Sequence, residues 1–427
     1  MIRIMEYGKI PNSELFARVI PQNNVAGVVT QIMEDVRLRG DAALLEYTKK
    51  FDGAELAQLK VTQAEMDAAL TAVEPEYLEI LQEAAANIRA FHEKQVRSSF
   101  VMTQANGVVL GQKVTPIEKV GLYVPGGTAA YPSTVLMDVV PAKIAGCSTI
   151  VMVTPPGRDG TIAPAVLAAA AVAGVTDVFK VGGAQAVAAL AYGTQSIPKV
   201  DKIVGPGNAY VSEAKRQVYG MVSIDMIAGP SEILIVADGK SDPAHVAADM
   251  LSQAEHDKLA CAVLVTDSLS LAQQVQAELE KQIPLLPRRD IARASIDDLG
   301  KIIVAPNLQV VLEIANEIAP EHLELMVDDP FAYLDGIRNA GSIFMGRYCP
   351  EALGDYFAGP NHTLPTSGTA RFSSPLGVDD FVKKSQFTYY TAQALDAVAD
   401  KVAFFARKEG LEAHARSALI RSGEETK

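Results

Sequence analysis

The sequence predicts an α/β protein with two open, mostly parallel sheets, and three observations favour this class. Apolar residues recur at helical spacing over residues 25–96, so the first hundred residues should be mostly α-helical. Short β-rich runs then alternate with Ala-rich helical stretches over residues 119–204, and a second alternating series covers residues 233–345. Such alternation is typical of parallel sheets with helices on their faces. A chain of 427 residues should divide into more than one globule.

Local patterns set the expected elements in chain order. Val29, Ile32, Met33 and Val36 form the apolar stripe of an early amphipathic helix. The predicted strands cover residues 120–124, 149–154, 177–181, 202–204, 233–237, 261–266, 302–305, 323–327 and 342–345. Between them, one helix is expected over 164–173, ended by Gly174, and another after the cap Asp242. Two further helices should end at residue 282 and at residue 318.

The last seventy residues predict a long loop and two helices. Residues 354–377 are rich in Gly, Pro, Ser and Thr, which is typical of a functional or disordered loop. Helical spacing follows over residues 392–408 and again from Leu411 to Leu419, with His414 on the second apolar stripe. Two short helices cannot form a core alone, so they should dock on the main body or on a second subunit. Residues 422–427 are expected to fray.

Composition excludes several classes of protein. The formal charge of −13 without a Lys/Arg block argues against a nucleic-acid partner. Cys147, Cys261 and Cys349 are odd in number and lack CxxC spacing, so neither a disulfide framework nor a cysteine zinc site is supported, and a cytoplasmic location fits best. The longest apolar run, residues 162–175, is too short for a membrane span, and the N-terminus lacks the pattern of a leader. We therefore expect a soluble protein with no membrane partner.

Four glycine turns adjoin predicted strands and indicate a ligand site. They lie at residues 123–127, 181–185, 205–208 and 229–232. Turns at the carboxyl edge of a parallel sheet are where open α/β folds bind ligands, and glycine lets backbone N–H groups approach phosphate closely. No GxGxxG motif occurs, and ordinary turn chemistry explains any single turn equally well. Their number favours a nucleotide.

Four of the six histidines lie in polar strings, three of which predict a metal site. Gln253 and His256 are three residues apart at a helix end, where they could ligate a metal or simply hydrogen-bond the helix terminus. Together with Asp355 and His414 they would form a nitrogen and oxygen site suited to zinc or manganese, although sequence alone does not bring them together. His245 shares the helix of Gln253 but is expected to be solvated.

The string Pro320-Glu321-His322 suits proton transfer. His322 could act as a base near neutral pH and Glu321 could activate water. In a regular strand the two side chains would point to opposite faces, so they can share one site only if the Ala319-Pro320 turn distorts the strand's start. A solvent-exposed pair at a strand edge explains these residues equally well.

Several of these strings closely resemble the histidinol dehydrogenase family. They are SQAEHD at 252–257, APEHLE at 319–324, GDYFAGPNHTLP at 354–365, SSPL at 373–376 and EGLEAH at 409–414. The resemblance keeps the order of the motifs, includes the glycine turns and spans residues 25 to 420.

The resemblance implies a zinc-dependent, NAD-linked oxidation of L-histidinol through the aldehyde to L-histidine, the last step of histidine biosynthesis. One Zn2+ per subunit would be held by ligands that match Gln253, His256, Asp355 and His414. Glu321 and His322 match the acid/base pair. The positions matching substrate contacts are Ser231, Gln253, His256, His322, Asp355, His362, Glu409 and His414, and those matching NAD contacts are Tyr123, Gln185 and Asn208.

The resemblance also implies two incomplete Rossmann-like open sheets with small helical terminal extensions that intertwine in a homodimer. In this chain that predicts an N-terminal extension (1–25), a first globule with the metal and catalytic residues (26–115 plus 229–378), a second globule with the NAD-binding turns (116–228) and a C-terminal tail docked on the partner subunit (379–427). Glu409 and His414 would then complete the neighbouring site.

Three alternatives remain. The chain could be a family relative that oxidises another amino alcohol or a polyol, although Glu409 and His362 favour histidinol. A zinc hydrolase would use the same ligands, but it would leave the glycine turns without a role. A binding protein without turnover would need neither Glu321 nor His322.

Overall fold

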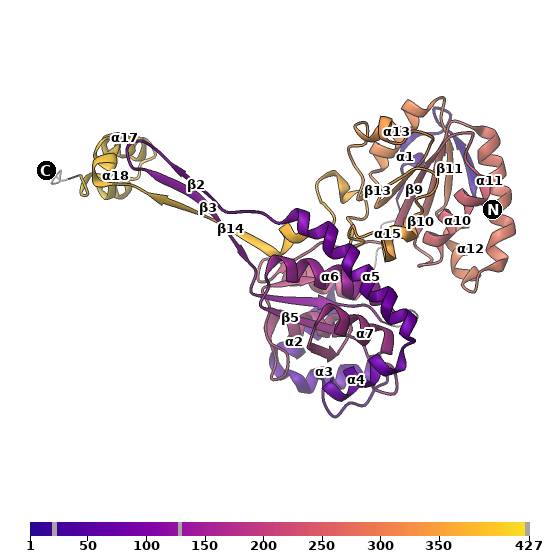
Figure 1. Cartoon of the computed structure of the whole chain (residues 1–427), viewed down its shortest axis with the longest axis horizontal. Helices are drawn as coiled ribbons and strands as arrows, with labels where there is room; N and C mark the ends of the chain where they lie inside the picture. Colours follow the sequence, from indigo (N-terminus) through magenta and orange to yellow (C-terminus); the bar gives the residue numbers. More distant parts are fainter. Residues whose placement is uncertain (19–23, 127–129, 423–427) are drawn as a thin grey trace. The chain divides into compact units, whose positions relative to one another are not determined.

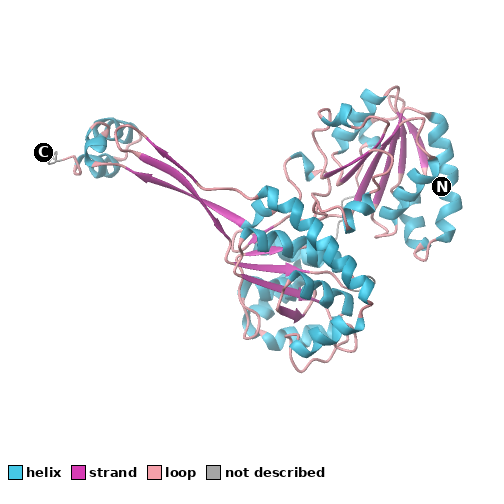
Figure 2. Ribbon diagram, in the orientation of Figure 1, coloured by secondary structure: helices cyan, strands magenta, loops and turns pink. Residues whose placement is uncertain are grey.

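Three sheets organise the chain in the computed structural model (Figures 1 and 2), which describes residues 1–18, 24–126 and 130–422. Two are parallel and belong to a first unit, residues 1–95 and 118–380. The third is antiparallel and belongs to a second unit, residues 96–117 and 381–427. The predicted α/β class with two parallel sheets is therefore confirmed.

The six-stranded sheet has the order β1-β11-β10-β9-β12-β13, and every pair in it is parallel. Its strands are β1 (Arg3–Glu6), β9 (Glu232–Ala237), β10 (Cys261–Thr266), β11 (Lys301–Val304), β12 (His322–Met326) and β13 (Ser342–Met345). One apolar cluster joins it to α10 (Pro243–Ala254), α11 (Leu269–Gln282) and α12 (Arg289–Asp298). A second cluster joins it to α1 (Asn12–Leu15) and α13 (Leu308–Ile318). The sheet is thus covered on both faces, as its continuous apolar strands require.

The five-stranded sheet has the order β6-β5-β4-β7-β8 and is also parallel. Its strands are β4 (Lys119–Tyr123), β5 (Thr149–Thr154), β6 (Asp177–Lys180), β7 (Lys202–Val204) and β8 (Ser223–Ile224). The helices α2 (Ala26–Arg39), α3 (Asp41–Phe51), α8 (Gly183–Tyr192) and α9 (Ala209–Val218) share one apolar cluster with it. A second helical layer consists of α4 (Gln63–Ala72), α5 (Pro75–His92), α6 (Pro132–Ala145) and α7 (Pro164–Ala173), which contact one another.

The second unit contains the antiparallel sheet β14-β3-β2 and three short helices. They are β2 (Phe100–Thr103), β3 (Val109–Pro116), β14 (Val382–Tyr389), α16 (Ala392–Asp396), α17 (Ala399–Lys408) and α18 (Glu412–Leu419). Its small apolar core consists of Ala399, Ala403, Ala406, Ala415 and Leu419. The single helix predicted over 392–408 is in fact two, α16 and α17.

The remaining short elements are α14 (Phe331–Leu334), α15 (Glu351–Tyr356) and the 3-10 turns η1 (Glu93–Gln95), η2 (Ile283–Leu285), η3 (Thr369–Arg371) and η4 (Val378–Phe381). Helix ends follow the expected chemistry, since Gly174 ends α7 in the left-handed conformation and Asp242 caps α10 through the amide of Ala244. The loop expected over 354–377 starts inside α15.

The packing of residues 26–115 differs from the predicted grouping with 229–378. Val29, Ile32, Met33 and Val36 are buried in the cluster of the five-stranded sheet, so α2 belongs with residues 118–224. Residues 100–116 instead pair with β14, and part of the expected N-terminal extension enters the six-stranded sheet as β1. Residues 19–23 of that extension, residues 127–129 and residues 423–427, predicted to fray, lie outside the described residues.

Two predictions, on membrane-spanning helices and on disulfides, can be compared with the described residues. Within 1–18, 24–126 and 130–422, no helix has both the length and the apolar character needed to cross a membrane. None of the three cysteines, all of which the structure describes, forms a disulfide.

Candidate active site

Glu321 and His322 share one site because the chain is bent just before β12. Ala319 ends α13 with φ 50°, a left-handed conformation that is uncommon outside glycine, and β12 begins only at His322. Glu321 therefore precedes the regular strand and is free of its alternation. Its Oε2 lies 3.7 Å from Nδ1 of His322, and both side chains are buried. The distortion that the sequence required is confirmed, and a solvent-exposed pair is ruled out.

A backbone contact fixes the tautomer of His322. Its Nδ1 lies 2.9 Å from the carbonyl oxygen of Glu232, and because a carbonyl only accepts, Nδ1 carries the proton that is donated. The other ring nitrogen, Nε2, is buried without a hydrogen-bond partner among the described residues. Glu321 is held by the same segment, since its Oε2 accepts from the amide of Glu232 at 2.8 Å. His322 thus presents Nε2 to the site, the geometry of a general base.

Helix α15 places two more carboxylates opposite β12. Glu351 donates its amide to Oε1 of Glu324 at 2.7 Å, while Asp355 Oδ1 lies 3.8 Å from His322 Nε2. Glu351 and Asp355 are four residues apart on a helix, a rise of about 6 Å, and His322 and Glu324 are two residues apart on a strand, a rise of about 6.6 Å. The spacing of the two pairs therefore matches. Glu351 Oε1 also lies 3.9 Å from His322 Nε2. These distances exceed a hydrogen bond.

Burial and mutual charge shift the titration of the cluster. Burial raises the pKa of Glu321 to about 8 and that of Glu351 to about 7. Burial alone would lower the pKa of His322, but the carboxylates around it, Glu321 foremost, outweigh that effect and raise it to about 10. Burial would likewise raise the pKa of Asp355, yet the neighbouring imidazoles, above all His322, lower it to about 2. The site is an acidic pocket that favours a cation.

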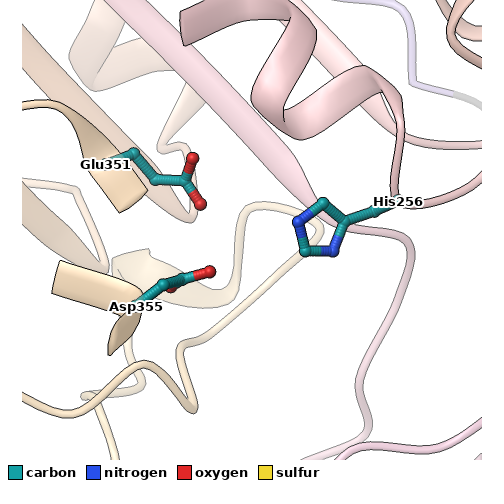
Figure 3. Close-up of side chains that lie close together, drawn as sticks. All are labelled: His256, Glu351 and Asp355. Carbon is teal, nitrogen blue, oxygen red and sulfur yellow. The ribbon is translucent and has the colours of Figure 1, made fainter. Parts of the chain in front are cut away.

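Three side chains of the pocket could hold a metal ion (Figure 3). The candidate ligand atoms of His256, Glu351 and Asp355 all lie within 4.8 Å of one another, and the picture shows both carboxylates projecting from α15 toward the imidazole. Burial lowers the pKa of His256, which keeps it neutral as a ligand. Gln253 fits the same role because its Oε1 is buried without a hydrogen-bond partner in the described part of the chain. This donor set suits zinc or manganese.

The structure places Gln253 and His256 differently from a regular helical pair. Gln253 lies in α10, which ends at Ala254, and His256 follows in the next turn, with its amide 3.2 Å from the carbonyl of Gln253. His245, in the first turn of the same helix, is exposed, as predicted.

His362 lies beside the cluster and connects it to α6. Its Nδ1 donates to the carbonyl oxygen of Asp355 at 3.0 Å, so its Nε2 accepts from the hydroxyl of Thr134, 3.3 Å away. The next residue, Thr363, hydrogen-bonds to the buried carboxyl of Asp138 on the same helix at 3.2 Å. The loop that carries His362 therefore joins the six-stranded sheet to the helices of the five-stranded sheet.

Other predicted substrate residues are distributed over both units. Ser231 immediately precedes β9, partly buried, at the edge of the sheet where β12 begins with His322. Glu409 and His414 belong to the second unit, where both are exposed.

The three predicted cofactor residues line one cavity of about 1070 Å³. Tyr123 ends β4, Gln185 lies in the first turn of α8, and Asn208 caps α9 through the amides of Tyr210 and Val211. The Tyr123 hydroxyl accepts from the amide of Gly183 at 3.1 Å. The cavity lies at the carboxyl edge of the five-stranded sheet, where a nucleotide was expected.

The fourth glycine turn was misplaced by the prediction. Residues 229–231 precede β9 and Glu232 begins it, so this turn lies at the amino edge of the six-stranded sheet, on the side of Glu321 and His322. Gly127, in the first turn, lies outside the described residues.

The sequence reasoning missed Glu351, Glu324 and Asp52. Glu351 could have been found, because it stands four residues before Asp355 and shares its helical face. Glu324 could have been found from its alternation with His322 along one strand. No comparable signal marks Asp52, which lines the cofactor cavity from the end of α3.

A nucleotide-sized cavity on one parallel sheet and a buried acid–imidazole cluster on the other are typical of two-domain α/β enzymes. The comparisons with known proteins give the particular class: the chain belongs to the histidinol dehydrogenase family, whose model matches residues 17–422. It is therefore an oxidoreductase by family.

Similar proteins cover nearly the whole chain. A histidinol dehydrogenase from Geobacillus kaustophilus is 58% identical over 92% of this chain and 93% of its own length. One from Listeria monocytogenes is 55% identical over 97% of this chain and 98% of its own. The crystal structure of histidinol dehydrogenase from Elizabethkingia anophelis matches with a TM-score of 0.94 at 38% identity, covering 98% of both chains. The match supports the dehydrogenase over the hydrolase alternative.

Proposed function

We propose that this chain oxidises L-histidinol to L-histidine in two steps, with NAD as the hydride acceptor and zinc as the resident metal. The observation that carries the proposal is the buried Glu321–His322 pair facing Asp355 and Glu351, in a chain similar to histidinol dehydrogenases throughout. The substrate follows from the names of those relatives. The residues of the pocket supply the proton transfers that both steps need.

His322 removes the protons in this scheme. Its Nδ1–H is held by the carbonyl of Glu232, so Nε2 is directed to take the hydroxyl proton as hydride leaves the carbinol carbon. The aldehyde then adds water, which Glu321 activates, and the hydrate loses a second hydride with His322 again as the base. The first oxidation releases one proton and the second releases two, because the carboxylic acid formed ionises, and each oxidation reduces one NAD, so one histidinol yields two NADH.

Gln253, His256 and Asp355, with His414, are the proposed zinc ligands, and Glu351 adds a further carboxylate at the same point. When bound, zinc supplies an anchor that orients the imidazole and amine of the substrate. Asp355 already holds negative charge at this position, and a divalent cation offsets it. His362 and Ser231 flank the proposed substrate site, and Tyr123, Gln185 and Asn208 line the cavity proposed for NAD.

The second unit is proposed to complete the site of a partner subunit. Glu409 and His414 are exposed on a unit whose own core is small, and Phe404 and Phe405 are exposed beside them. A homodimer would cover these aromatic side chains and bring the partner's imidazole to the metal. We also propose a cytoplasmic location, which the absence of disulfides supports.

An absorbance assay tests the reaction. Purified protein with L-histidinol and excess NAD should produce two NADH per histidinol, and removal of zinc by a chelator should abolish the signal until zinc is restored. A flat trace at high enzyme concentration would overturn the proposal. Turnover of other amino alcohols or polyols in preference to histidinol would replace the substrate.

Mixed subunits test the shared site. His414→Ala and His256→Ala proteins should each be inactive, and mixing them should restore part of the activity, because one hybrid site contains both imidazoles. Absence of recovery despite demonstrated subunit exchange would contradict a contribution in trans.

A further inference from the structure

Asp52 presents an unpaired carboxylate to the cavity that contains Tyr123, Gln185 and Asn208. It follows the last residue of α3 and caps that helix, so its backbone is fixed by a hydrogen bond to the carbonyl of Thr48 at 2.9 Å. Its side chain lines the cavity of about 1070 Å³. Within the described residues, its Oδ2 is buried and has no hydrogen-bond partner. A buried carboxylate oxygen without a donor costs free energy unless a ligand provides one.

The surroundings of Asp52 contain no cation that satisfies it. Arg158 lines the same cavity, but no hydrogen bond or ion pair joins it to Asp52 in the part of the chain that is described, and Arg158 is exposed. Burial raises the pKa of Asp52 to about 6, and no neighbouring charge opposes that shift. The carboxylate is therefore available to accept hydrogen bonds from a neutral donor. It would repel a second negative group.

A ribose diol is the part of a dinucleotide that meets these requirements. Its two adjacent hydroxyls donate to one carboxylate, and enzymes that use NAD often bind the ribose through an acidic residue. That residue commonly lies about 20 residues after the glycine turn of the first strand. Asp52 instead precedes β4, the first strand of its sheet, by more than sixty positions. The acid would come from a helix in front of the sheet.

The two helical layers indicate which of the two riboses of NAD Asp52 contacts. Asp52 ends α3, which packs with α2 and α8. The contact with His362 comes from Thr134 of α6, which packs with α5 and α7 in the other layer. Because the nicotinamide has to approach the His322 side, the layer of α6 that contacts His362 is assigned to the nicotinamide half and the end of α3 to the adenosine half.

We propose that Asp52 binds the hydroxyls of the adenosine ribose and thereby selects NAD over NADP, whose 2′-phosphate would meet its charge. This inference rests on the proposed use of NAD. It assigns to Asp52 a specificity role that the reaction itself does not require.

Calorimetric titration of the whole protein with NAD and NADP tests the assignment without turnover. The unmodified protein should bind NAD at least tenfold more tightly than NADP. Asp52→Asn keeps the shape but loses the charge, and it should weaken NAD binding roughly 10- to 100-fold while NADP binding is unchanged or improved. Asp52→Glu should keep NADP excluded. Glu55→Gln removes the same charge from an exposed neighbour outside the cavity lining and should change neither affinity.

The outcomes separate this inference from the proposed function. If the unmodified protein does not bind NAD, both fail. If it binds NAD and Asp52→Asn, with an unchanged melting temperature, keeps the preference for NAD over NADP, only the role of Asp52 is overturned. Titration of Asp52→Asn with ADP-ribose and with nicotinamide mononucleotide locates the contact. A loss of affinity for ADP-ribose alone supports the adenosine side, and a loss of affinity for the mononucleotide alone overturns that assignment.

Discussion

Replacing Lys215 with Met should destabilise the five-stranded half of the protein and weaken cofactor binding. Lys215 forms an ion pair with Asp225 in which the two side chains are only 2% and 1% exposed. The pair holds the peptide of Gly205 from both sides, since Lys215 Nζ donates to its oxygen at 2.9 Å and Asp225 Oδ2 accepts from its amide at 2.8 Å. Gly205 opens the turn that leads to Asn208 in the cavity proposed for NAD. The ion pair therefore fixes one wall of that cavity.

The expected loss follows from the burial of the pair. Removing one partner of a buried ion pair leaves an uncompensated charge and costs about 3–5 kcal/mol. Lys240→Met is a matched control, because Lys240 pairs with Asp328 where the side chains are 74% and 57% exposed, and such a pair contributes at most about 1 kcal/mol. The double variant Lys215→Met with Asp225→Leu should recover much of the loss, since no charge then remains buried.

Urea unfolding followed by far-ultraviolet circular dichroism gives the free energy of unfolding, and calorimetry gives the NAD affinity. Lys215→Met should lower both, while Lys240→Met lowers neither by a comparable amount. If the two single variants lose the same small free energy, the buried pair does not hold this turn. If Lys215→Met unfolds more easily but binds NAD normally, the link to the cavity is wrong.

Four other substitutions address the proposed catalytic cluster and the loop beside it. His322→Asn should impair both oxidations, whereas Glu321→Gln should spare the first; rapid mixing resolves the two NADH, and equal losses would contradict the division of roles. Glu351→Gln should weaken zinc binding roughly 10- to 100-fold in competition with a chromogenic chelator, and an unchanged affinity would remove Glu351 from the metal site. Burial, and then the charge of Asp225, raises the pKa of Asp138 well above its usual value. Folding therefore takes up a proton there, and this contribution to stability, present below about pH 4, is lost as pH rises. The stability of Asp138→Asn relative to the unmodified protein should therefore be greater at pH 8 than at pH 5. If the difference between the urea midpoints of the two proteins is the same at both pH values, the reasoning is refuted.

The elements whose bounds were predicted well from the sequence are those whose ends are set by residues within or next to the element. The strand 261–266 and the helix 164–173 have the predicted bounds, because β-branched runs, a helix-starting Pro and a glycine in the left-handed conformation act within a few residues. The helix after Asp242 likewise starts at its cap. Local patterning was sufficient for the fold class and for most elements of the first unit.

Long-range pairing escaped the sequence reasoning for a physical reason. The strands β2 and β14 are exposed along nearly their whole length, so their residues show no alternation between buried and exposed faces. β14 also pairs with β3 across more than 250 residues. Similarly, the apolar stripe of α2 shows that the helix is amphipathic but not which sheet it covers.

The Glu321–His322 part of the site could be predicted because the backbone distortion that this pair requires could be stated from the sequence. Glu321 and His322 needed a distorted turn, and Ala319 provides it. Glu351 escaped because no histidine stands beside it and its approach to His256 depends on how α15 lies along β12. A pair adjacent in sequence was recognisable as one site, whereas separate ligands such as His256 and Asp355 could be named from the sequence but not brought together.

The proposed catalytic groups lie at the amino edge of the six-stranded sheet, although open α/β folds usually bind ligands at the carboxyl edge. Arg347 joins the carboxyl ends of the central strands β9 and β12 by hydrogen bonds. Its guanidinium contacts both oxygens of Asp238, which follows β9, at 2.8 and 2.9 Å, and Asp328, which follows β12, at 3.0 Å. It also donates to the carbonyl of Met326 at 2.7 Å. Ion pairs thus occupy the carboxyl ends of β9 and β12, whereas at the amino ends His322 begins its strand and the carbonyl of Glu232 sets its tautomer.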